Sequence, residues 1–213
     1  LCAPRVRDRS TLDREGNDFQ LDGPRVSMLL TVSGPPGSGK STTAAGLAEA
    51  FDLEHISGGD IFRDLAAERD YTAVEFNKLA EENEQIDLDL DRRLYKFATQ
   101  RDDGLLESRL AGWLAGNEAD LRFWLSAPVA VRAQRIAGRE EKPVDRSHEE
   151  TIEQEHSEAK RYNTYYNIDI DDLSIYDVVL NTARWDPTDV LKITTTAVNN
   201  YRADGDEGKL PVQ

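Results

Sequence analysis

Cysteine is almost absent from the sequence: Cys2 is the only one among 213 residues. An intrachain disulfide and a cysteine-based metal cluster are therefore excluded. The three histidines, His55, His148 and His156, do not have the spacing of zinc ligands. No apolar run approaches the ~20 residues that span a bilayer, and the first 27 residues contain no apolar region of the kind found in secretory signals. These absences predict a protein of the reducing cytoplasm.

Lysine is also scarce. The chain has 41 acidic and 26 basic residues, for a net charge of −15, and only 7 of the basic residues are lysine against 19 arginines. An excess of aspartate and the use of arginine in place of lysine are typical of proteins that work in molar salt, where charges are screened over about 3 Å. An ordinary acidic cytosolic protein is the alternative. The negative charge disfavours nucleic acid and anionic membranes as partners.

The chain length is that of one α/β domain. Residues 1–27 are polar and without periodicity, and Met28, the only methionine, directly precedes the first apolar run. We expect residues 1–27 to be a disordered extension or a mis-assigned start, with a genuine N-terminal arm as the alternative. The domain should cover residues 28–202 and be monomeric, and residues 203–213 should form a polar tail.

Short apolar segments alternate with helical patterns from Met28 onward. This alternation predicts an α/β fold with a five-stranded parallel sheet covered on both faces. The expected strands are 28–34, 53–57, 104–108, 121–127 and 176–182, and the expected helices are 40–51, 60–70, 73–83, 88–100, 128–141, 148–166 and 187–201.

The strongest motif lies between the first strand and the first helix. Residues 34–41 fit the pattern G-x-x-x-x-G-K-[ST] at every constrained position. Such a loop aims successive backbone N–H groups at a phosphate beside a helix N-terminus. We expect Lys40 to reach the β- and γ-phosphates of ATP and the Ser41 hydroxyl to bind Mg²⁺. The predicted ATP-binding residues are Gly34, Pro35, Pro36, Gly37, Ser38, Gly39, Lys40, Ser41 and Thr42.

The segment after the second strand distinguishes a phosphotransferase from a switch or a motor. There is no Asn-Lys-x-Asp for guanine, and a motor ATPase would usually be larger. Instead, residues 57–63 read SGGDIFR. This segment resembles the nucleoside monophosphate kinases, in which the second strand leads to a Gly-Asp-φ-φ-Arg helix start (φ, apolar). The resemblance implies that Arg63, with Asp60, binds the acceptor phosphate; a solvated helix arginine is the alternative. Gly58 stands where adenylate kinases carry threonine, which disfavours AMP.

Two further segments are more specific. The sequence ESRLAGW at 107–113 and the stretch RYNTYYNIDIDDLSIYD at 161–177 resemble the archaeal type of cytidylate kinase. We expect Glu107, at the end of a buried strand, to orient a water on Mg²⁺ and Arg109 to point toward the acceptor phosphate. A strand-capping ion pair between Glu107 and Arg109 is the alternative. The resemblance implies that Arg161 is a lid arginine that closes on the transferring phosphoryl group.

The helix 128–141 carries Arg-Ile-Ala-Gly-Arg, which is similar to the entry to the mobile lid of adenylate-kinase-like proteins. The resemblance implies that Arg135 covers the donor adenine and that Arg139 meets the γ-phosphate. A plain helical surface is the alternative, and Arg132 and Arg146 are weaker candidates.

The resemblance covers roughly residues 28–200. It implies a P-loop three-layer fold with small monophosphate-binding and lid segments, and Mg²⁺-assisted transfer of the γ-phosphoryl of ATP to CMP or dCMP. The expected catalytic residues are Lys40, Arg139 and Arg161. An AMP-preferring kinase and a non-catalytic ATP-binding module stay open as alternatives. Asp169 and Asp171 are candidates for contacting the cytosine amine, although surface salt bridges would explain them equally well.

Overall fold

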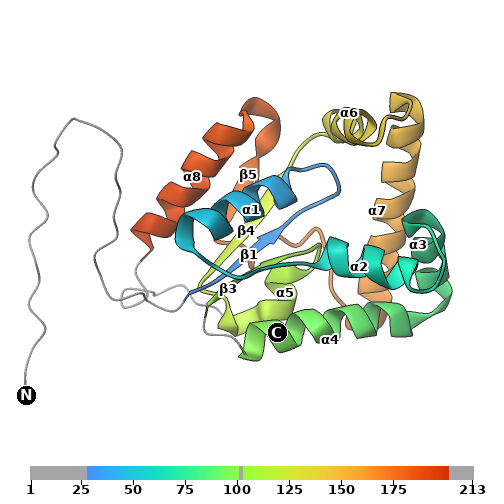
Figure 1. The fold of residues 1–213 in the computed structure, drawn as a ribbon, viewed down its shortest axis with the longest axis horizontal. Coiled ribbons are helices and arrows are strands. Elements are labelled where there is room, and N and C mark those ends of the chain that lie inside the picture. The colour runs from blue at the N-terminus through green and yellow to red at the C-terminus, as the bar shows by residue number, and fades with distance from the viewer. Residues whose placement is uncertain (1–27, 101–102, 202–213) are drawn as a thin grey trace, which may run out of the picture.

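The computed structural model describes residues 28–100 and 103–201 (Figure 1). Its centre is a five-stranded sheet with the order β2-β3-β1-β4-β5, in which every neighbouring pair is parallel. The predicted fold class is therefore confirmed. The expectations for residues 1–27 and for the tail 203–213 lie outside the described residues. The strands are β1 (Leu29–Ser33), β2 (His55–Ser57), β3 (Gly104–Glu107), β4 (Leu121–Ser126) and β5 (Val178–Asn181).

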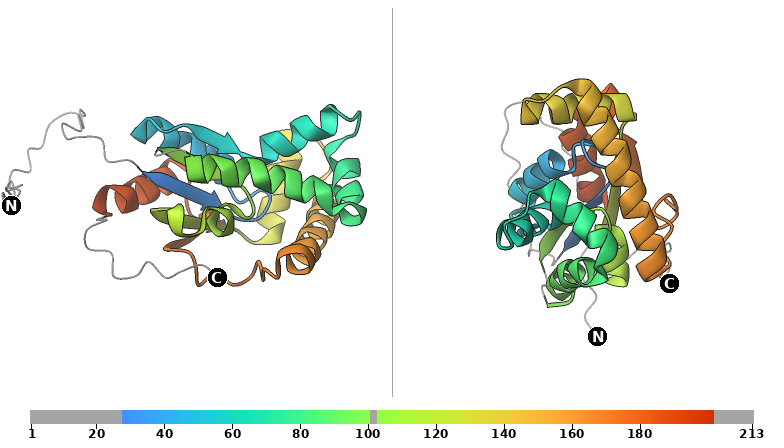
Figure 2. Two further views of the ribbon diagram at one scale, coloured as in Figure 1. Left: turned by 90° about the horizontal axis from the view of Figure 1, so that it is seen from below. Right: turned by 90° about the vertical axis from the view of Figure 1, so that its right-hand side faces the viewer.

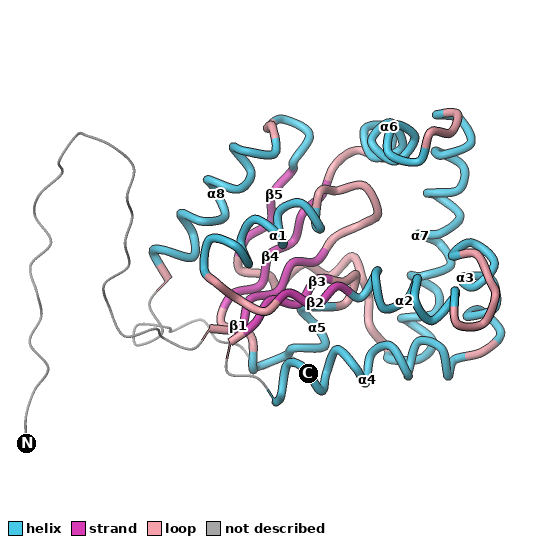
Figure 3. Tube along the Cα trace, in the orientation of Figure 1, coloured by secondary structure: helices cyan, strands magenta, loops and turns pink. Residues whose placement is uncertain are grey.

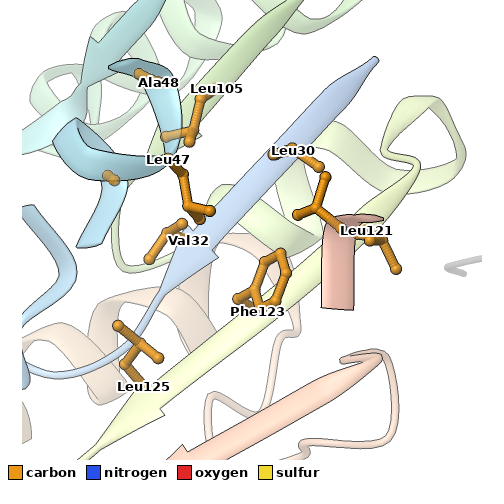
Figure 4. Packing of buried hydrophobic residues seen from close by; sticks show 10 residues of the cluster. Leu30, Val32, Leu47, Ala48, Leu105, Leu121, Phe123 and Leu125 are labelled. Atoms are coloured by element: carbon orange, nitrogen blue, oxygen red, sulfur yellow. The ribbon is translucent and has the colours of Figure 1, made fainter. Parts of the chain in front are cut away.

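The central strand β1 is buried along its whole length because helices cover both of its faces (Figure 3). Leu30 and Val32 point to the face covered by α1 (Lys40–Phe51) and α8 (Pro187–Asn200). Figure 4 shows these two side chains packed with Leu47 of α1 and Phe123 of β4. Alternation along the strand sends Leu29 to the opposite face, where it packs with α4 (Glu84–Gln100) and α5 (Ala111–Ala115).

The remaining helices lie beyond the carboxyl ends of the strands (Figures 1 and 2). A small separate core joins α2 (Gly58–Ala67), α3 (Ala73–Glu82) and the start of α4 through Leu65, Phe76 and Ile86. The helix α6 (Val129–Glu140) packs against the long helix α7 (Val144–Tyr166). Since loops and helix N-termini at this edge of a parallel sheet form ligand sites, these helices surround the expected site.

Several boundaries differ from the sequence prediction. The helix α7 begins at Val144, directly after Pro143, and not at residue 148, because Pro143 is itself a suitable helix start. The helix α4 begins at Glu84, where Asn83 breaks the chain direction after α3. Three short elements were not predicted: α5 and two 3₁₀ turns, η1 (Gly116–Glu118) and η2 (Thr182–Arg184). Of the helices in the described ranges, none is both long enough and apolar enough to cross a membrane.

Candidate active site

The glycine-rich loop between β1 and α1 has a backbone that only glycine permits. Gly34, Gly37 and Gly39 have φ angles of 146°, 76° and 97°. A Cβ atom on Gly34 would lie 2.1 Å from the carbonyl oxygen of Leu125, and one on Gly37 would lie 2.8 Å from that of Arg132. Gly39 is the N-cap of α1 and offers no side-chain hydrogen bond. The first N–H groups of α1 are thus left for an anion at the positive end of the helix.

Lys40 is the first residue of α1 and lies folded back over the loop, with its Nζ atom donating a hydrogen bond to the Pro35 carbonyl at 3.2 Å. Burial, opposed by the charge of Glu107 and helped by that of the nearby Arg109, lowers the pKa of Lys40 to about 8. A desolvated cation beside unpaired N–H groups is suited to bind phosphate, because the anion would replace the favourable interactions with water that the ammonium group loses on burial.

Ser41 and Glu107 form the second part of the loop site. The Ser41 hydroxyl donates a hydrogen bond of 2.8 Å to Oε1 of Glu107, and His55 Nε2 lies 3.4 Å from Oε2. Burial alone would raise the pKa of Glu107, but the His55 contact, the Lys40 charge and the Ser41 hydrogen bond outweigh it and lower that pKa. Glu107 is therefore a buried carboxylate that stays ionised.

The donors at this point fit a magnesium ion. Oε2 of Glu107 is buried and makes no directed hydrogen bond, with only His55 Nε2 beside it at 3.4 Å, and Oε1 accepts from the Ser41 hydroxyl. Mg²⁺ prefers one or two oxygen donors from the protein together with phosphate oxygens and waters. Among the described residues there is no cluster of three or more metal-ligating side chains.

Replacing Glu107 with glutamine is expected to lower kcat by about 10²-fold, in the range for loss of one electrostatic contact to the reacting groups. The amide keeps the shape of the side chain but offers Mg²⁺ a neutral oxygen, so the Mg²⁺ concentration for half-maximal rate should rise as well. Initial rates across a Mg²⁺ titration measure both quantities. A lower kcat with an unchanged Mg²⁺ requirement would contradict the metal role, and Glu54→Gln on the neighbouring chain segment is the control.

A cleft of about 400 Å³ opens above this loop. It brings together five basic residues that the sequence analysis placed in one site: Lys40, Arg63, Arg109, Arg139 and Arg161. The loop and α6 form one side of the cleft, which we call the donor side. The helices α2, α3 and α4 form the other, which we call the acceptor side. The roles of the individual arginines stay predictions.

Each of these four arginines is paired with an acid. Arg63 pairs with Asp60 and Arg139 with Glu140, both on the surface, with 61% and 66% of the arginine side chains exposed. Arg109 pairs with Glu158 at 2.8 Å and Arg161 with Asp87 at 2.8 Å, with 12% and 4% exposed. Exposed pairs are weak and exchange easily, so Arg63 and Arg139 are free to turn to phosphate. The buried pairs are held in place. Arg109 does not pair with Glu107, so the alternative of a strand-capping ion pair is wrong.

Arg161 lies on the inward face of α7 and not on an exposed lid segment. Its Nε atom donates to Asp87 and its Nη1 atom donates to Asn77 Oδ1 at 3.1 Å and to Ser157 Oγ at 2.7 Å. These bonds tie α7 to α3 and α4 on the acceptor side. The catalytic role predicted for Arg161 stays a prediction, and in this structure its Nε and Nη1 atoms are already hydrogen-bonded within the protein.

Arg135 and Arg132 brace the loop from behind. Arg135 donates to the Thr182 hydroxyl at 2.9 Å and to the Gly37 carbonyl at 3.2 Å, and it is not among the residues that line the cleft. Arg132, treated as a weaker candidate, is buried and donates to the carbonyls of Ala127 and Pro36 at 2.8 and 3.1 Å. Its Nη1 and Nη2 atoms also donate to the Glu155 carboxylate on α7. Sequence reasoning underestimated Arg132, because these partners lie on other segments and no local motif reveals them.

Other predicted residues lie at or beyond the rim. Asp60 is exposed and binds Arg63, and Arg146 is exposed and binds Glu150. Asp169 and Asp171 lie after the end of α7, where Asp169 accepts a hydrogen bond from the Asp171 backbone, and neither lines the cleft. They are therefore not in a position to contact a base bound there.

The acceptor side contains two acids that the sequence analysis missed, Asp87 and Asp91. They lie four residues apart on α4, on the turn that also presents Leu90 to the cleft. The sequence does not distinguish them, because Asp89, which is outside the cleft, also directly follows an apolar residue, Leu88. Burial raises the pKa of both carboxyls, that of Asp91 to about 7.

A model of the cytidylate kinase-like family matches residues 29–184. The chain belongs to this family. It is 62% identical over 186 residues to the cytidylate kinase of Halorubrum lacusprofundi, which covers 87% of this chain and 97% of that protein. It is 43% identical over 178 residues to the cytidylate kinase of Methanocaldococcus jannaschii, covering 82% of this chain and 99% of that protein. The family assignment agrees with the resemblance read from residues 107–113 and 161–177.

Solved structures with little sequence similarity share the fold. Shikimate kinase from Acinetobacter baumannii superposes with a TM-score of 0.56 at 13% identity, covering 84% of this chain and 97% of that chain. This likeness shows that the chain and shikimate kinase share the same α/β fold.

Proposed function

We propose that the protein transfers the γ-phosphoryl group of ATP to CMP or dCMP, giving ADP and CDP or dCDP. The observation that carries the proposal is the single cleft in which the glycine-rich loop, the Ser41–Glu107 pair and the arginines of the acceptor side face one another. Family membership supports a cytidine monophosphate as the acceptor.

On the donor side, the loop residues 34–42 hold the triphosphate through backbone N–H groups, and Lys40 adds positive charge at the β- and γ-phosphates. Ser41 and Glu107 are the residues that would hold Mg²⁺, and the bound ion would supply positive charge to the donor phosphates. Arg139 lies in the last turn of α6 and is held only by an exposed ion pair with Glu140. It can therefore exchange that contact for one with the transferring phosphoryl group. Arg135 positions the loop and the connection after β5, next to where the adenine is expected.

On the acceptor side, Arg63 and Arg109 hold the monophosphate. Arg109 is oriented by Glu158 and lies over the ring of Trp124 at 5.7 Å, so its guanidinium is fixed before substrate arrives. Phosphoryl transfer requires in-line placement and positive charge around the equatorial oxygens more than it requires a general base. The cleft provides that positive charge within a protein of net charge −15.

ADP release with a panel of acceptors tests this function. CMP, dCMP, UMP, AMP and GMP are each supplied with Mg-ATP, in dilute buffer and in molar KCl. We expect CMP and dCMP to raise ADP release well above the rate with ATP alone. Because acidic self-repulsion is screened in salt, and relatives at 62% identity come from Halorubrum and Haloarcula, the rate should be higher in molar KCl. Turnover mainly on AMP would contradict the base assignment.

A further inference from the structure

The acceptor side holds a buried carboxylate oxygen with no assigned task. Oδ2 of Asp91 is buried and has no directed hydrogen bond, although Asp91 is one of the residues that line the cleft. The nearby acid Asp87 is different, because its Oδ2 accepts a hydrogen bond from Arg161. A buried carboxylate oxygen without a partner costs free energy, so its presence in a substrate cleft points to a bound donor.

The groups around Asp91 leave it without a strong partner. Burial raises the pKa of Asp91 and so does Asp87 on the same helix, while the Tyr166 hydroxyl and Arg161, both on α7, lower it. The Nε atom of Arg161 donates to Asp87, and its Nη1 atom donates to Asn77 and Ser157. The buried Tyr166 hydroxyl faces Asp91 and acts on its pKa as a hydrogen-bond donor, but it is not aligned for a well-directed bond to Oδ2, which leaves that oxygen open to a second donor. Tyr162, also on α7, is buried and faces both acids.

We propose that the carboxyl of Asp91 distinguishes cytosine from uracil, by accepting a hydrogen bond from the exocyclic amine of the acceptor base. This inference rests on the proposed function. Leu90 on α4, with Phe62 on α2 and Val74 on α3, gives the same side of the cleft apolar surface for the face of a base. Arg63 and Arg109 lie at the phosphate end of that side. Cytosine presents an N–H₂ donor where uracil presents a carbonyl oxygen, so an ionised carboxylate attracts one base and repels the other.

The decisive experiment compares kcat/KM for CMP and UMP in the wild type and in Asp91→Asn, at pH 8 and saturating Mg-ATP. An amide offers either an oxygen or an N–H₂ group, so the variant accommodates both bases. We expect the CMP-to-UMP ratio to fall by about tenfold or more, mainly through KM, since sites built around one hydrogen bond discriminate strongly against its absence. Asp89→Asn, on the same helix but paired with Gln85 and outside the cleft, is the matched control and should keep the ratio.

A structural role gives a different result. If Asp91 only supports the fold, both substrates should lose rate equally and the ratio should stay constant, which would overturn the inference. Burial raises the pKa of Asp91 from 3.8 to about 7, so the folded state loses stability as the pH rises between these two values, and the full cost is present at pH 8. Asp91→Asn removes this cost, and it should melt no lower than the wild type at pH 8.

The wild type supplies a second test that needs no variant. A neutral carboxyl donates its proton to the uracil carbonyl, so the CMP-to-UMP ratio of kcat/KM should rise between pH 6 and pH 8.5 as Asp91 ionises. The phosphate groups of both substrates titrate alike and cancel in the ratio. A flat ratio would overturn the inference. If the wild type does not phosphorylate CMP at all, the proposed function fails; if it does and the ratio is unchanged in Asp91→Asn, the role of Asp91 alone fails.

Discussion

Lys40→Ala is expected to lower kcat/KM for CMP by about 10³-fold, the upper range for removing one preorganised electrostatic contact. The substitution removes the only lysine within the glycine-rich loop and its helix start. Burial lowers the pKa of Lys40 to about 8, so at pH 7 the folded state carries the lysine as a buried cation, at a cost to stability that the unfolded state does not have. Thermal unfolding of the variant at pH 7 should therefore occur at the same temperature as in the wild type, or higher.

The matched control is Lys78→Ala. Lys78 also lines the cleft, but its side chain is 63% exposed and pairs with Glu153 at 3.6 Å. Its removal should change the rate by less than about threefold, the scale of an exposed ion pair. Retention of most activity in Lys40→Ala, or an equal loss in both variants, would contradict the role of Lys40.

The largest effect on stability is expected at the Arg161–Asp87 pair. Both side chains are 4% exposed, and the pair joins α7 to α4 across the acceptor side. Arg161→Met leaves Asp87 buried without its cation, which should lower the free energy of unfolding by about 3–5 kcal/mol. For a domain of this size the melting temperature should fall by about 10 °C. Differential scanning calorimetry in molar KCl measures the change.

A double variant separates loss of the pair from loss of packing. Asp87→Leu combined with Arg161→Met replaces the pair with apolar groups and should recover most of the stability. Burial raises the pKa of Asp87 and Arg161 opposes that rise, so the pKa should increase further without the arginine. The defect of the single variant should therefore grow with rising pH. Arg92→Met, which breaks the exposed pair with Asp89 on α4, is the control and should have little effect. No recovery in the double variant would contradict this account.

Local patterns predicted the parts of the site that are local in sequence. The spacing of Gly34, Gly37 and Gly39 predicted a loop whose backbone angles, as observed, only glycine adopts freely. The apolar runs predicted all five strands because a buried parallel strand needs a continuous apolar segment. Helix ends were less accurate, as at Glu84 and Val144, because propensity changes little across a terminal turn.

Pairings between distant segments were not predictable. Arg161 meets Asp87, 74 positions away, and Arg109 meets Glu158, 49 positions away. Which acid an arginine meets depends on how α3, α4 and α7 pack together, and the helical periodicity of each segment does not contain that information. The chain has 41 acidic residues, so sequence alone offered too many equivalent partners. For the same reason the two acids facing the acceptor were found only in the structure.

The most direct test of the central claim is the stoichiometry of the reaction with CMP and Mg-ATP in molar KCl, followed by ³¹P NMR. Transfer between the two sides of the cleft predicts that CDP and ADP appear in equal amounts, with no inorganic phosphate, and that both disappear in Lys40→Ala. Inorganic phosphate formed in place of CDP, at a rate that CMP does not change, would contradict phosphoryl transfer and identify a hydrolase instead.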